Sequence, residues 1–353
     1  MPSPVVTPFD HPEFAGHEQI VFCHAREAGL RAIVAIHDTR LGPALGGCRM
    51  WPYPTAADAL ADVLRLSRGM TYKNALAGLD LGGGKAVLIG DRRAVGRTAL
   101  LEAFGDHVER LGGRYVTAED VGMSVADLDV IATRTRHARG TSHRGLGDPS
   151  PFTADGVVAG IRAALRHRLG SSDPAGRTIA IAGVGSVGCG VAQRLDALGA
   201  TLVVADIDAT AVQRVTESFG ARAAAVDAIH CVEVDVFAPC ALGGVLDART
   251  IPELGAPIVA GAANNQLASP DDAERLRDRG ILYAPDYAIN AGGVISIALG
   301  ETGERAVVDA KIAAIGDTLE AIFRRAEHEG RTTAEIADRM AEERIAGARA
   351  RVA

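Results

Sequence analysis

Apolar residues recur with two different spacings along the first third of the chain. Runs rich in apolar and β-branched residues, typical of strands, occupy residues 30–36, 86–89 and 114–117. Between them, residues 55–70 and 98–111 place apolar side chains three or four positions apart, which predicts amphipathic helices. Segment 41–54 (LGPALGGCRMWPYP) is rich in glycine and proline and is expected to be a loop. Strands that alternate with helices predict an α/β fold.

The remaining two thirds begin with a change of pattern at residues 139–151, which contain few large apolar residues. A helix over 153–169 leads into the second unit. A βαβ unit follows, formed by a strand over 178–182, a helix through 198 and a strand over 201–205. Residues 318–348 are helical again and are expected to pack back on the first domain. We therefore predict an N-terminal α/β substrate and oligomerisation domain, 1–148 with about 325–353, and a Rossmann NAD-binding domain, 149–324.

Composition narrows the class of protein. Hydrophobic residues make up 48% of the 353 residues, which is enough for two cores. The net charge of −7, spread along the chain, gives no reason to bind nucleic acid or anionic membrane. The five cysteines form no C-x-x-C pair, so no metal site is suggested, and such a set fits a reduced, cytoplasmic protein. The first 14 residues lack the basic and apolar regions of a secretion signal, and no apolar run is long enough to span a membrane.

Glycines with dinucleotide-binding spacing follow the strand over 178–182. Gly183, Gly185 and Gly188 form G-x-G-x-x-G between a strand and a helix, the context in which this motif holds a pyrophosphate at a helix N-terminus. Asp206 follows Gly188 at the end of the next strand, where a carboxylate can accept hydrogen bonds from ribose hydroxyls and would repel a 2′-phosphate. The sequence therefore favours NAD over NADP. The alternative is a glycine turn with a surface aspartate.

Two lysines stand in the segment MTYKNALAGLDLGGGKAV. Lys73 is placed just past a predicted helix, and Lys85 ends a glycine run before a buried strand. The run is not a P-loop, because Ala86 follows the lysine where Ser or Thr is required. A lysine beside a buried strand can act as a general base, since burial disfavours its charged form. The alternative for either lysine is a solvated surface charge.

Asp120 follows the predicted strand over 114–117, in TAEDVG. A carboxylate at the C-terminal end of a strand commonly faces the ligand crevice of an α/β fold. The other interpretation is a cap for the helix that follows, and the sequence alone does not separate the two.

These segments together resemble the glutamate/leucine/phenylalanine/valine dehydrogenase family, most closely its leucine and valine dehydrogenases. The resemblance covers nearly the whole chain. It is carried, in family order, by LGPALGGCRM, MTYKNALAGLDLGGGKAV, TAEDVG, FTADGV, GVGSVG, DVFAPCALGG, GAANNQL and ILYAPDYAINAGGV.

The resemblance implies a chemical role for each matching residue. Lys73 would pair with the substrate carboxylate, helped by the backbone of Gly46 and Gly47. Lys85 would be the general base that activates water, and Asp120 would assist proton transfer beside the amino group. The implied reaction is hydride transfer from the α-carbon of an L-amino acid to NAD, followed by hydrolysis of the imine to a 2-oxo acid and ammonia.

The resemblance also implies cofactor contacts. Asn290 would hold the substrate near the nicotinamide, and Thr153 would contact the carboxamide. The other implied cofactor-binding residues flank the glycines, the aspartate and the cleft: Val184, Ser186, Val187, Ile207, Ala238, Cys240, Ala262 and Asn264. Family members commonly oligomerise through the first domain, so a homo-oligomer is expected.

The implied side-chain pocket is apolar. Its lining residues would be Leu45, Met70, Ala118, Val294 and Ile297. An apolar lining leaves a glutamate side chain without a charge partner, which favours a branched aliphatic substrate: valine, leucine or isoleucine. One methylene of pocket space discriminates by only ~1–3 kcal/mol, so overlap among these substrates is expected.

Three alternatives remain at this point. The chain could instead act on aromatic amino acids such as phenylalanine, although the methyl group of Ala118 narrows the pocket. It could be a non-catalytic NAD-binding protein or a structural subunit of a larger assembly. Cys48, Met123 and Ile297 depart from the family pattern beside the pocket, and they bear on the substrate rather than on the chemistry.

Overall fold

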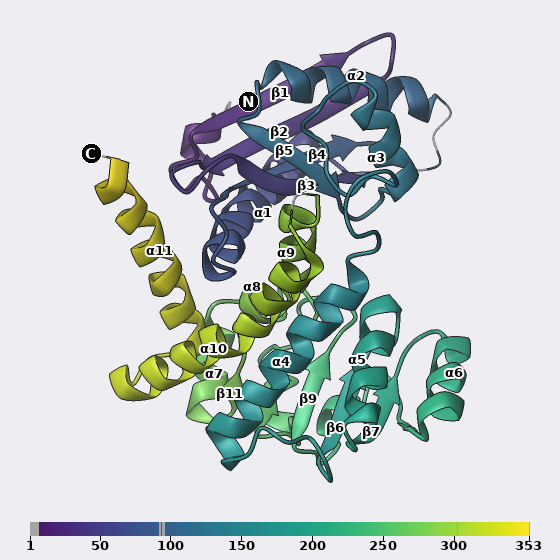
Figure 1. Ribbon diagram of the computed structural model, residues 1–353, viewed down its shortest axis with the longest axis vertical. Helices are drawn as coiled ribbons and strands as arrows, with labels where there is room; N and C mark the ends of the chain where they lie inside the picture. The colour runs from purple at the N-terminus through teal and green to yellow at the C-terminus, as the bar shows by residue number, and fades with distance from the viewer. Residues whose placement is uncertain (1–6, 92, 94–95, 302, 353) are drawn as a thin grey trace, which may run out of the picture. The chain divides into compact units, whose positions relative to one another are not determined.

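The computed structural model describes residues 7–91, 93, 96–301 and 303–352; the beginning of the segment tested for a secretion signal lies outside them. The chain divides into two compact units. Unit 1 comprises residues 1–147, 297–303 and 342–353, and unit 2 comprises residues 148–296 and 304–341. Figure 1 shows helices layered against a sheet within each unit, so the predicted two-domain α/β fold is confirmed.

Unit 1 is built on a five-stranded sheet, counted over the described residues, with the order β1-β2-β4-β3-β5. The strands are β1 (Gln19–Ala25), β2 (Leu30–Asp38), β3 (Ala44–Trp51), β4 (Gly82–Ile89) and β5 (Tyr115–Glu119). β1 and β2 are antiparallel, as are β2 and β4, whereas β3 runs parallel to both β4 and β5. The carboxyl ends of β3, β4 and β5 therefore lie at one edge of the sheet.

Two of these strands correct the sequence prediction. Segment 41–54 was expected to be a loop, but its middle forms β3, the strand between β4 and β5. β4 begins at Gly82 rather than at Ala86, so Lys85 lies inside the strand. Tertiary packing overrides the poor strand propensity of glycine here: a Cβ at Gly83 would lie 2.1 Å from the backbone nitrogen of Thr71.

Helices cover both faces of this sheet (Figure 1). They are α1 (Ala56–Leu76), α2 (Arg97–Arg110) and α3 (Val125–Ala132), whereas the short η1 (Pro8–Asp10) precedes β1 and buries no residue. Ile33, Ala35 and Val87 pack with α1 on one face, and the other face packs with α2 and α3 around Phe104. The helix predicted to end at residue 70 continues to Leu76, so Lys73 lies in its last turn rather than beyond it.

Unit 2 contains a parallel sheet of six strands, over the described residues, with the order β11-β10-β9-β6-β7-β8. Its first elements are α4 (Ser150–Leu169), β6 (Thr178–Ala182), α5 (Ser186–Ala197), β7 (Thr201–Ala205), α6 (Ala209–Phe219), β8 (Arg222–Ala223) and η2 (Ile229–Cys231). They are followed by β9 (Val236–Pro239), η3 (Ile251–Glu253), β10 (Ile258–Val259), α7 (Asp271–Asp278), β11 (Leu282–Tyr283), α8 (Asp286–Ile289) and α9 (Gly292–Leu299). Numbered from β6, the strand order is 3-2-1-4-5-6, which is that of dinucleotide-binding sheets.

The two faces of this sheet bury alternate residues of each strand. Ala180, Val203 and Phe237 pack with η2, η3 and α7 in one core. Ile179 and Ile181 face the other side, where α4 and α5 lie (Figure 1). The strand order changes direction between β6 and β9, and ligands of such folds bind beyond the carboxyl ends of the strands at this point.

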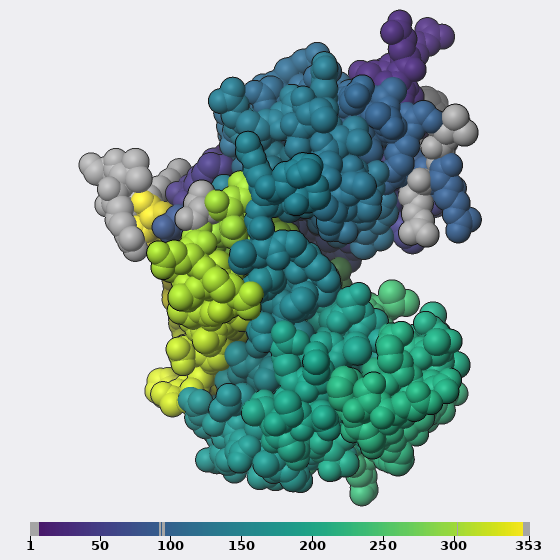
Figure 2. Space-filling model, turned by 45° about the vertical axis from the view of Figure 1, so that its right-hand side comes forward, coloured from purple at the N-terminus to yellow at the C-terminus, as the bar shows by residue number. Residues whose placement is uncertain are grey.

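The C-terminal region forms two helices, α10 (Arg305–Glu329) and α11 (Thr333–Val352). The single helical stretch expected over 318–348 is interrupted at Gly330, whose φ of 65° ends α10. α10 packs on α4 within unit 2, and Figure 2 shows them as neighbouring yellow-green and teal surfaces. The end of α11 packs on α1 within unit 1, where Glu342 accepts a 2.7 Å hydrogen bond from the Tyr72 hydroxyl. The segment grouped with unit 1 is shorter than the predicted 325–353.

Candidate functional site

A buried ion pair lies at the carboxyl edge of the unit 1 sheet. Lys85 projects from β4, Asp120 follows β5, and the Nζ and Oδ2 atoms are 2.7 Å apart. The side chains are 7% and 19% exposed. The sequence left a solvated lysine and a capping aspartate as alternatives, and neither describes this geometry. The N-cap of α3 is Ser124, whose hydroxyl accepts a hydrogen bond from the Asp127 backbone.

The charge of Asp120 is stabilised from two sides. Burial opposes ionisation, but the charges of Lys85 and Arg49 outweigh it and lower the pKa of Asp120 to about 2. Arg49 Nε lies 3.2 Å from Asp120 Oδ2, and Arg49 Nη1 lies 3.0 Å from Asp62. Tyr53 donates a 2.6 Å hydrogen bond to the same Asp62 carboxylate. The sequence prediction does not include Arg49, because it lies in the segment 41–54 that is expected to be a loop and that forms β3 in the structure.

Glycines let the strands and α1 approach closely beside this pair. A Cβ at Gly46 would lie 1.8 Å from the Gly84 carbonyl oxygen and 3.1 Å from Cγ of Met70. A Cβ at Gly47 would lie 2.8 Å from Cβ of Asp120. The run Gly82–Gly84 also marks close approach, as its sequence suggests, because a Cβ at Gly83 would meet the Thr71 backbone and one at Gly84 would meet the Tyr115 ring. Gly46, Gly47, Met70 and Asp120 are thus brought together.

Lys73 is carried to the same region by α1. It lies one turn after Met70, and residues three positions apart share one face of a helix. Lys73 lies in the last turn of α1. Just beyond it, Arg344 donates hydrogen bonds of 2.8 Å to the carbonyl oxygens of Ala75 and Leu79. Because Arg344 lies far along the sequence, the local pattern around residue 70 could not show that α1 continues.

The predicted pocket residues divide between the two units. Leu45 and Ala118 are buried in neighbouring strands of unit 1, at 1% and 3% exposure. Val294 and Ile297 lie one turn apart on the partly exposed face of α9, and they are grouped with unit 2 and unit 1 respectively. All four side chains are apolar, as the pocket hypothesis requires.

The glycine loop in unit 2 joins β6 to α5. Gly183 has a φ of 100°, a conformation that favours glycine. A Cβ at Gly188 would lie 1.9 Å from the Gly183 carbonyl oxygen and 3.3 Å from Cβ of Cys240, so α5 packs tightly on the ends of β6 and β9. A Cβ at Gly185 would meet nothing within 4 Å in the described part of the chain. This open approach to the N-terminus of α5 fits a pyrophosphate.

Asp206 follows β7 and faces the glycine loop. Its Oδ2 accepts a 2.7 Å hydrogen bond from the Val184 backbone nitrogen, and its Oδ1 accepts one of 2.9 Å from Asp208. Each carboxylate oxygen has a further lone pair, so both can still accept bonds from ribose hydroxyls. Ile207 beside it is 91% exposed, and Ser186 and Val187 open α5 within the loop.

A second cluster of predicted cofactor residues surrounds Asn290. Its Nδ2 donates hydrogen bonds to the Ala262 carbonyl oxygen at 3.0 Å and to Asn264 Oδ1 at 2.8 Å. Its Oδ1 is buried and has no partner among the described residues, so it can accept a hydrogen bond from a ligand. The Thr153 hydroxyl lies close to Gly293 in the same unit, 2.7 Å from the position of a Cβ there. Ala238 is fully buried within β9, so its side chain belongs to the sheet core.

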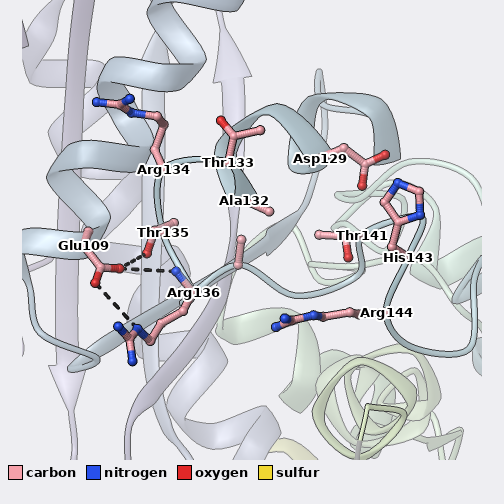
Figure 3. Close-up of a pocket in the computed structure, with 11 residues that line it drawn as sticks. Glu109, Asp129, Ala132, Thr133, Arg134, Thr135, Arg136, Thr141, His143 and Arg144 are labelled. Carbon is pink, nitrogen blue, oxygen red and sulfur yellow. Dashed lines mark hydrogen bonds and ion pairs between the residues drawn. The ribbon is translucent and has the colours of Figure 1, made fainter.

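A separate hollow of about 690 Å³ lies in unit 1 around the segment that follows α3. Figure 3 shows Glu109 bonded to Thr135 and Arg136 at one side, and His143 at the other. Arg134 and Arg136 are each paired with a carboxylate, of Asp106 and Glu109 respectively. The hollow is lined by none of the predicted site residues, so it is distinct from the lysine site.

None of the helices within the described residues is both long and apolar enough to cross a membrane.

The sheet order and the glycine loop together define unit 2 as a dinucleotide-binding fold, and unit 1 adds a lysine–aspartate pair of the kind used in proton transfer. Residues 17–137 match the model of the Glu/Leu/Phe/Val dehydrogenase dimerisation domain, and residues 204–351 match that of glutamate/leucine/phenylalanine/valine dehydrogenase. The chain belongs to this family of amino-acid dehydrogenases, which confirms the resemblance read from its motifs.

Relatives similar over nearly the full length support this assignment. Leucine dehydrogenase of Geobacillus stearothermophilus is 49% identical, over 96% of this chain and 93% of its own. Valine dehydrogenase of Streptomyces albus is 50% identical, over 99% and 98%. Among solved structures, L-tryptophan dehydrogenase from Nostoc punctiforme superposes with a TM-score of 0.84 at 42% identity, covering 95% and 97%.

Proposed function

We propose that this protein catalyses the reversible, NAD-dependent oxidative deamination of a branched-chain aliphatic L-amino acid to a 2-oxo acid and ammonia. The observation that carries the chemistry is the buried Lys85–Asp120 pair, 2.7 Å between charged atoms, at the carboxyl edge of the unit 1 sheet. Identities of 49% and 50% to a leucine and a valine dehydrogenase support the substrate class.

The kind of cation at the site supports base catalysis. The chain has only three lysines, Lys73, Lys85 and Lys311. Its other side chains that are positively charged at neutral pH are arginines. An arginine cannot give up its proton at neutral pH, whereas a lysine can. Lysine rather than arginine at position 85 is therefore what the proposed proton transfer requires.

The proposed mechanism assigns one task to each residue. Lys73 binds the substrate carboxylate with the backbone of Gly46 and Gly47, which orients the α-carbon. A bound NAD would supply the hydride acceptor for that carbon. Lys85 acts in its neutral form, after its proton has passed to Asp120, 2.7 Å from Nζ, and takes a proton from water as the water adds to the imine carbon. Asp120 then gives its proton to the amino group as ammonia leaves. One amino acid, one NAD⁺ and one water give the 2-oxo acid, ammonia, NADH and a proton.

NAD rather than NADP fits unit 2. Asp206 would bind the ribose hydroxyls, Gly185 leaves space at the start of α5, and Asn290 Oδ1 offers a buried acceptor on the nicotinamide side. Thr153, Cys240, Ala262 and Asn264 are the other residues proposed to line this part of the site.

The decisive experiment measures NADH formation with variants of the three lysines. Lys85→Ala is expected to lose nearly all turnover, and Lys73→Ala is expected mainly to raise KM for the amino acid. Lys311→Ala, on α10, is the matched control and should behave as the wild type. Near-normal turnover of Lys85→Ala would rule out the proposed base. NAD binding without any amino-acid-dependent NADH formation would favour a non-catalytic protein.

An aromatic substrate is the rival within the enzyme class, and the 42% identity to an L-tryptophan dehydrogenase favours it. The buried methyl group of Ala118 and the bulk of Ile297 argue for a smaller side chain. Relative kcat/KM for valine, leucine, isoleucine, phenylalanine and tryptophan separates the two. A highest value for either aromatic amino acid would refute the aliphatic proposal.

A homo-oligomer formed through unit 1 is also proposed. Residues 17–137 match a dimerisation domain, and Phe22 on the edge strand β1 is 60% exposed, which an interface would cover. Light scattering should give a multiple of the chain mass of 36.6 kDa. Phe22→Glu should lower the measured mass, whereas Val226→Glu in unit 2 should leave it unchanged; a monomeric wild type would contradict the proposal.

A cytoplasmic location is proposed from the thiols. All five cysteines are free in the structure, as expected of a protein that stays in a reducing compartment. Fractionation of the native host, with the enzyme followed by activity, tests this.

A further inference from the structure

Three side chains of different chemistry converge on the surface of unit 2, away from the residues discussed so far. His230 and Cys231 end η2, and Glu253 ends η3. His230 Nε2 lies 3.2 Å from Glu253 Oε2 and 3.4 Å from Cys231 Sγ, and the sulfur lies 3.8 Å from the same carboxylate oxygen. We call these residues the His-Cys-Glu cluster.

The backbone fixes the two turns that carry the cluster. Ile229 and Ile251 are buried, at 3% and 1% exposure, and anchor η2 and η3 in the same core. The Gly255 backbone nitrogen donates a 2.9 Å hydrogen bond to the His230 carbonyl oxygen. A Cβ at Gly255 would lie 2.4 Å from the Val232 carbonyl oxygen, so the two segments are in close backbone contact. The side chains therefore emerge from a rigid support.

The spacing of the three ligand atoms is that of one face of a tetrahedral zinc site. Zinc binds sulfur at ~2.3 Å, imidazole nitrogen at ~2.0–2.1 Å and carboxylate oxygen at ~2.0–2.2 Å. At tetrahedral angles these bond lengths place nitrogen and sulfur about 3.6 Å apart, nitrogen and oxygen about 3.4 Å, and sulfur and oxygen about 3.6 Å. The corresponding separations here are 3.4, 3.2 and 3.8 Å.

The charges also suit a divalent cation. A thiol that coordinates a divalent cation loses its proton, so Cys231 would bind as a thiolate. A thiolate, a carboxylate and a neutral imidazole then neutralise two positive charges.

We propose that the His-Cys-Glu cluster is a binding site for a thiophilic divalent cation such as Zn²⁺, with solvent completing the tetrahedron. The cluster lies before β9 and β10, at the amino edge of the parallel sheet, whereas the glycine loop lies at the carboxyl edge. The cation therefore stabilises unit 2 and takes no part in hydride transfer. The cysteine pattern did not indicate this site, because its ligands come from two turns 22 positions apart.

The test uses the untagged full chain, stripped with a chelator and titrated with Zn²⁺ against a chromophoric competitor. The wild type should bind one tight equivalent and gain a few degrees in Tm, because a ligand that binds only the folded state stabilises it. Cys231→Ser should lose the tight equivalent and the gain in Tm, and Glu253→Gln should weaken Zn²⁺ binding at least tenfold. Cys189→Ser, which removes a thiol outside the cluster, is the matched control and should match the wild type.

Substitution with Co²⁺ identifies the ligands directly. Thiolate-to-cobalt charge-transfer absorption should appear in the wild type and in Cys189→Ser, and should be absent in Cys231→Ser. Absence of a tight equivalent in the wild type, or an equal affinity and spectrum in Cys231→Ser, would overturn the proposal. Neither readout depends on catalytic activity, so the result is independent of the proposed reaction.

Discussion

Replacing Asp120 by Asn is expected to destabilise the protein more than any loss of a surface ion pair. The pKa of Asp120 falls from 3.8 to about 2, and at 1.36 kcal/mol per pKa unit this corresponds to about 2 kcal/mol of net stabilisation at neutral pH. This contribution is present above pH 3.8 and is lost as the pH falls toward 2. The substitution also leaves Lys85 buried without its counter-ion. Breaking a buried pair from one side costs ~3–5 kcal/mol, so we expect a loss of about 3 kcal/mol at pH 7.

The double variant Lys85→Met/Asp120→Asn gives the sharper test. An unpaired buried charge and two independent side chains predict changes of opposite sign in the free energy of unfolding relative to Asp120→Asn. If the unpaired buried charge dominates, the double variant regains about 1–2 kcal/mol relative to Asp120→Asn. If the two side chains act independently, it is less stable than either single variant. Urea unfolding at fixed protein concentration and pH 7 provides the free energies, provided that the m-values agree.

Asp106→Asn is the matched control for this cycle. Asp106 forms a 2.9 Å ion pair with Arg134 in the same unit, but both side chains are largely exposed, so we expect a loss below ~1 kcal/mol. An equal loss for Asp106→Asn and Asp120→Asn, or a double variant at the additive value, would refute the reasoning.

Three further predictions concern the scaffold around the site. Gly46→Ala should cost about 3 kcal/mol or more, because its Cβ would lie 1.8 Å from the Gly84 carbonyl oxygen; Gly69→Ala, with open space on α1, should raise Tm slightly. Burial and the charge of a neighbouring histidine lower the pKa of His37 to about 4, so stability should fall between pH 6.5 and 4. His37→Gln should remove up to about 3 kcal/mol of that fall in urea titrations, and an unchanged pH profile would contradict the assignment. Arg344→Met should lower Tm by removing charged hydrogen bonds to carbonyl oxygens at the end of α1, whereas Arg344→Lys should retain part of them.

The sequence predicted those helices and strands whose formation depends mainly on their own residues and those beside them. The βαβ unit over 178–205 was predicted within a residue or two, because its apolar strands and glycine turn carry their own signals. β3 was missed because its glycines are required by close contact with the neighbouring strands. Strand propensity is a property of single residues and does not include such contacts. The end of α1 was missed because Arg344, far along the chain, completes it.

The site was predictable in its residue types and less so in its network. Lys85 stood out as a lysine just before a predicted strand and Asp120 as a carboxylate just after one, and they meet at 2.7 Å. Arg49 did not stand out, because one arginine among many carries no signal until β3 brings it beside Asp120. The His-Cys-Glu cluster was likewise invisible, since it depends on how two surface turns pack.

The two hydrogen bonds that Asp206 accepts from the backbone have a consequence for coenzyme engineering. Replacing this carboxylate is the obvious way to admit the 2′-phosphate of NADP, since it removes a repelling charge. In this protein the same side chain also holds the Val184 amide of the glycine loop, at 2.7 Å. Asp206→Ala would therefore loosen the glycine loop that we propose binds the pyrophosphate, while relaxing coenzyme selectivity, and both coenzymes would bind more weakly. Asp206→Asn keeps an acceptor for Val184 without the charge, and is the better starting point for a redesigned coenzyme preference.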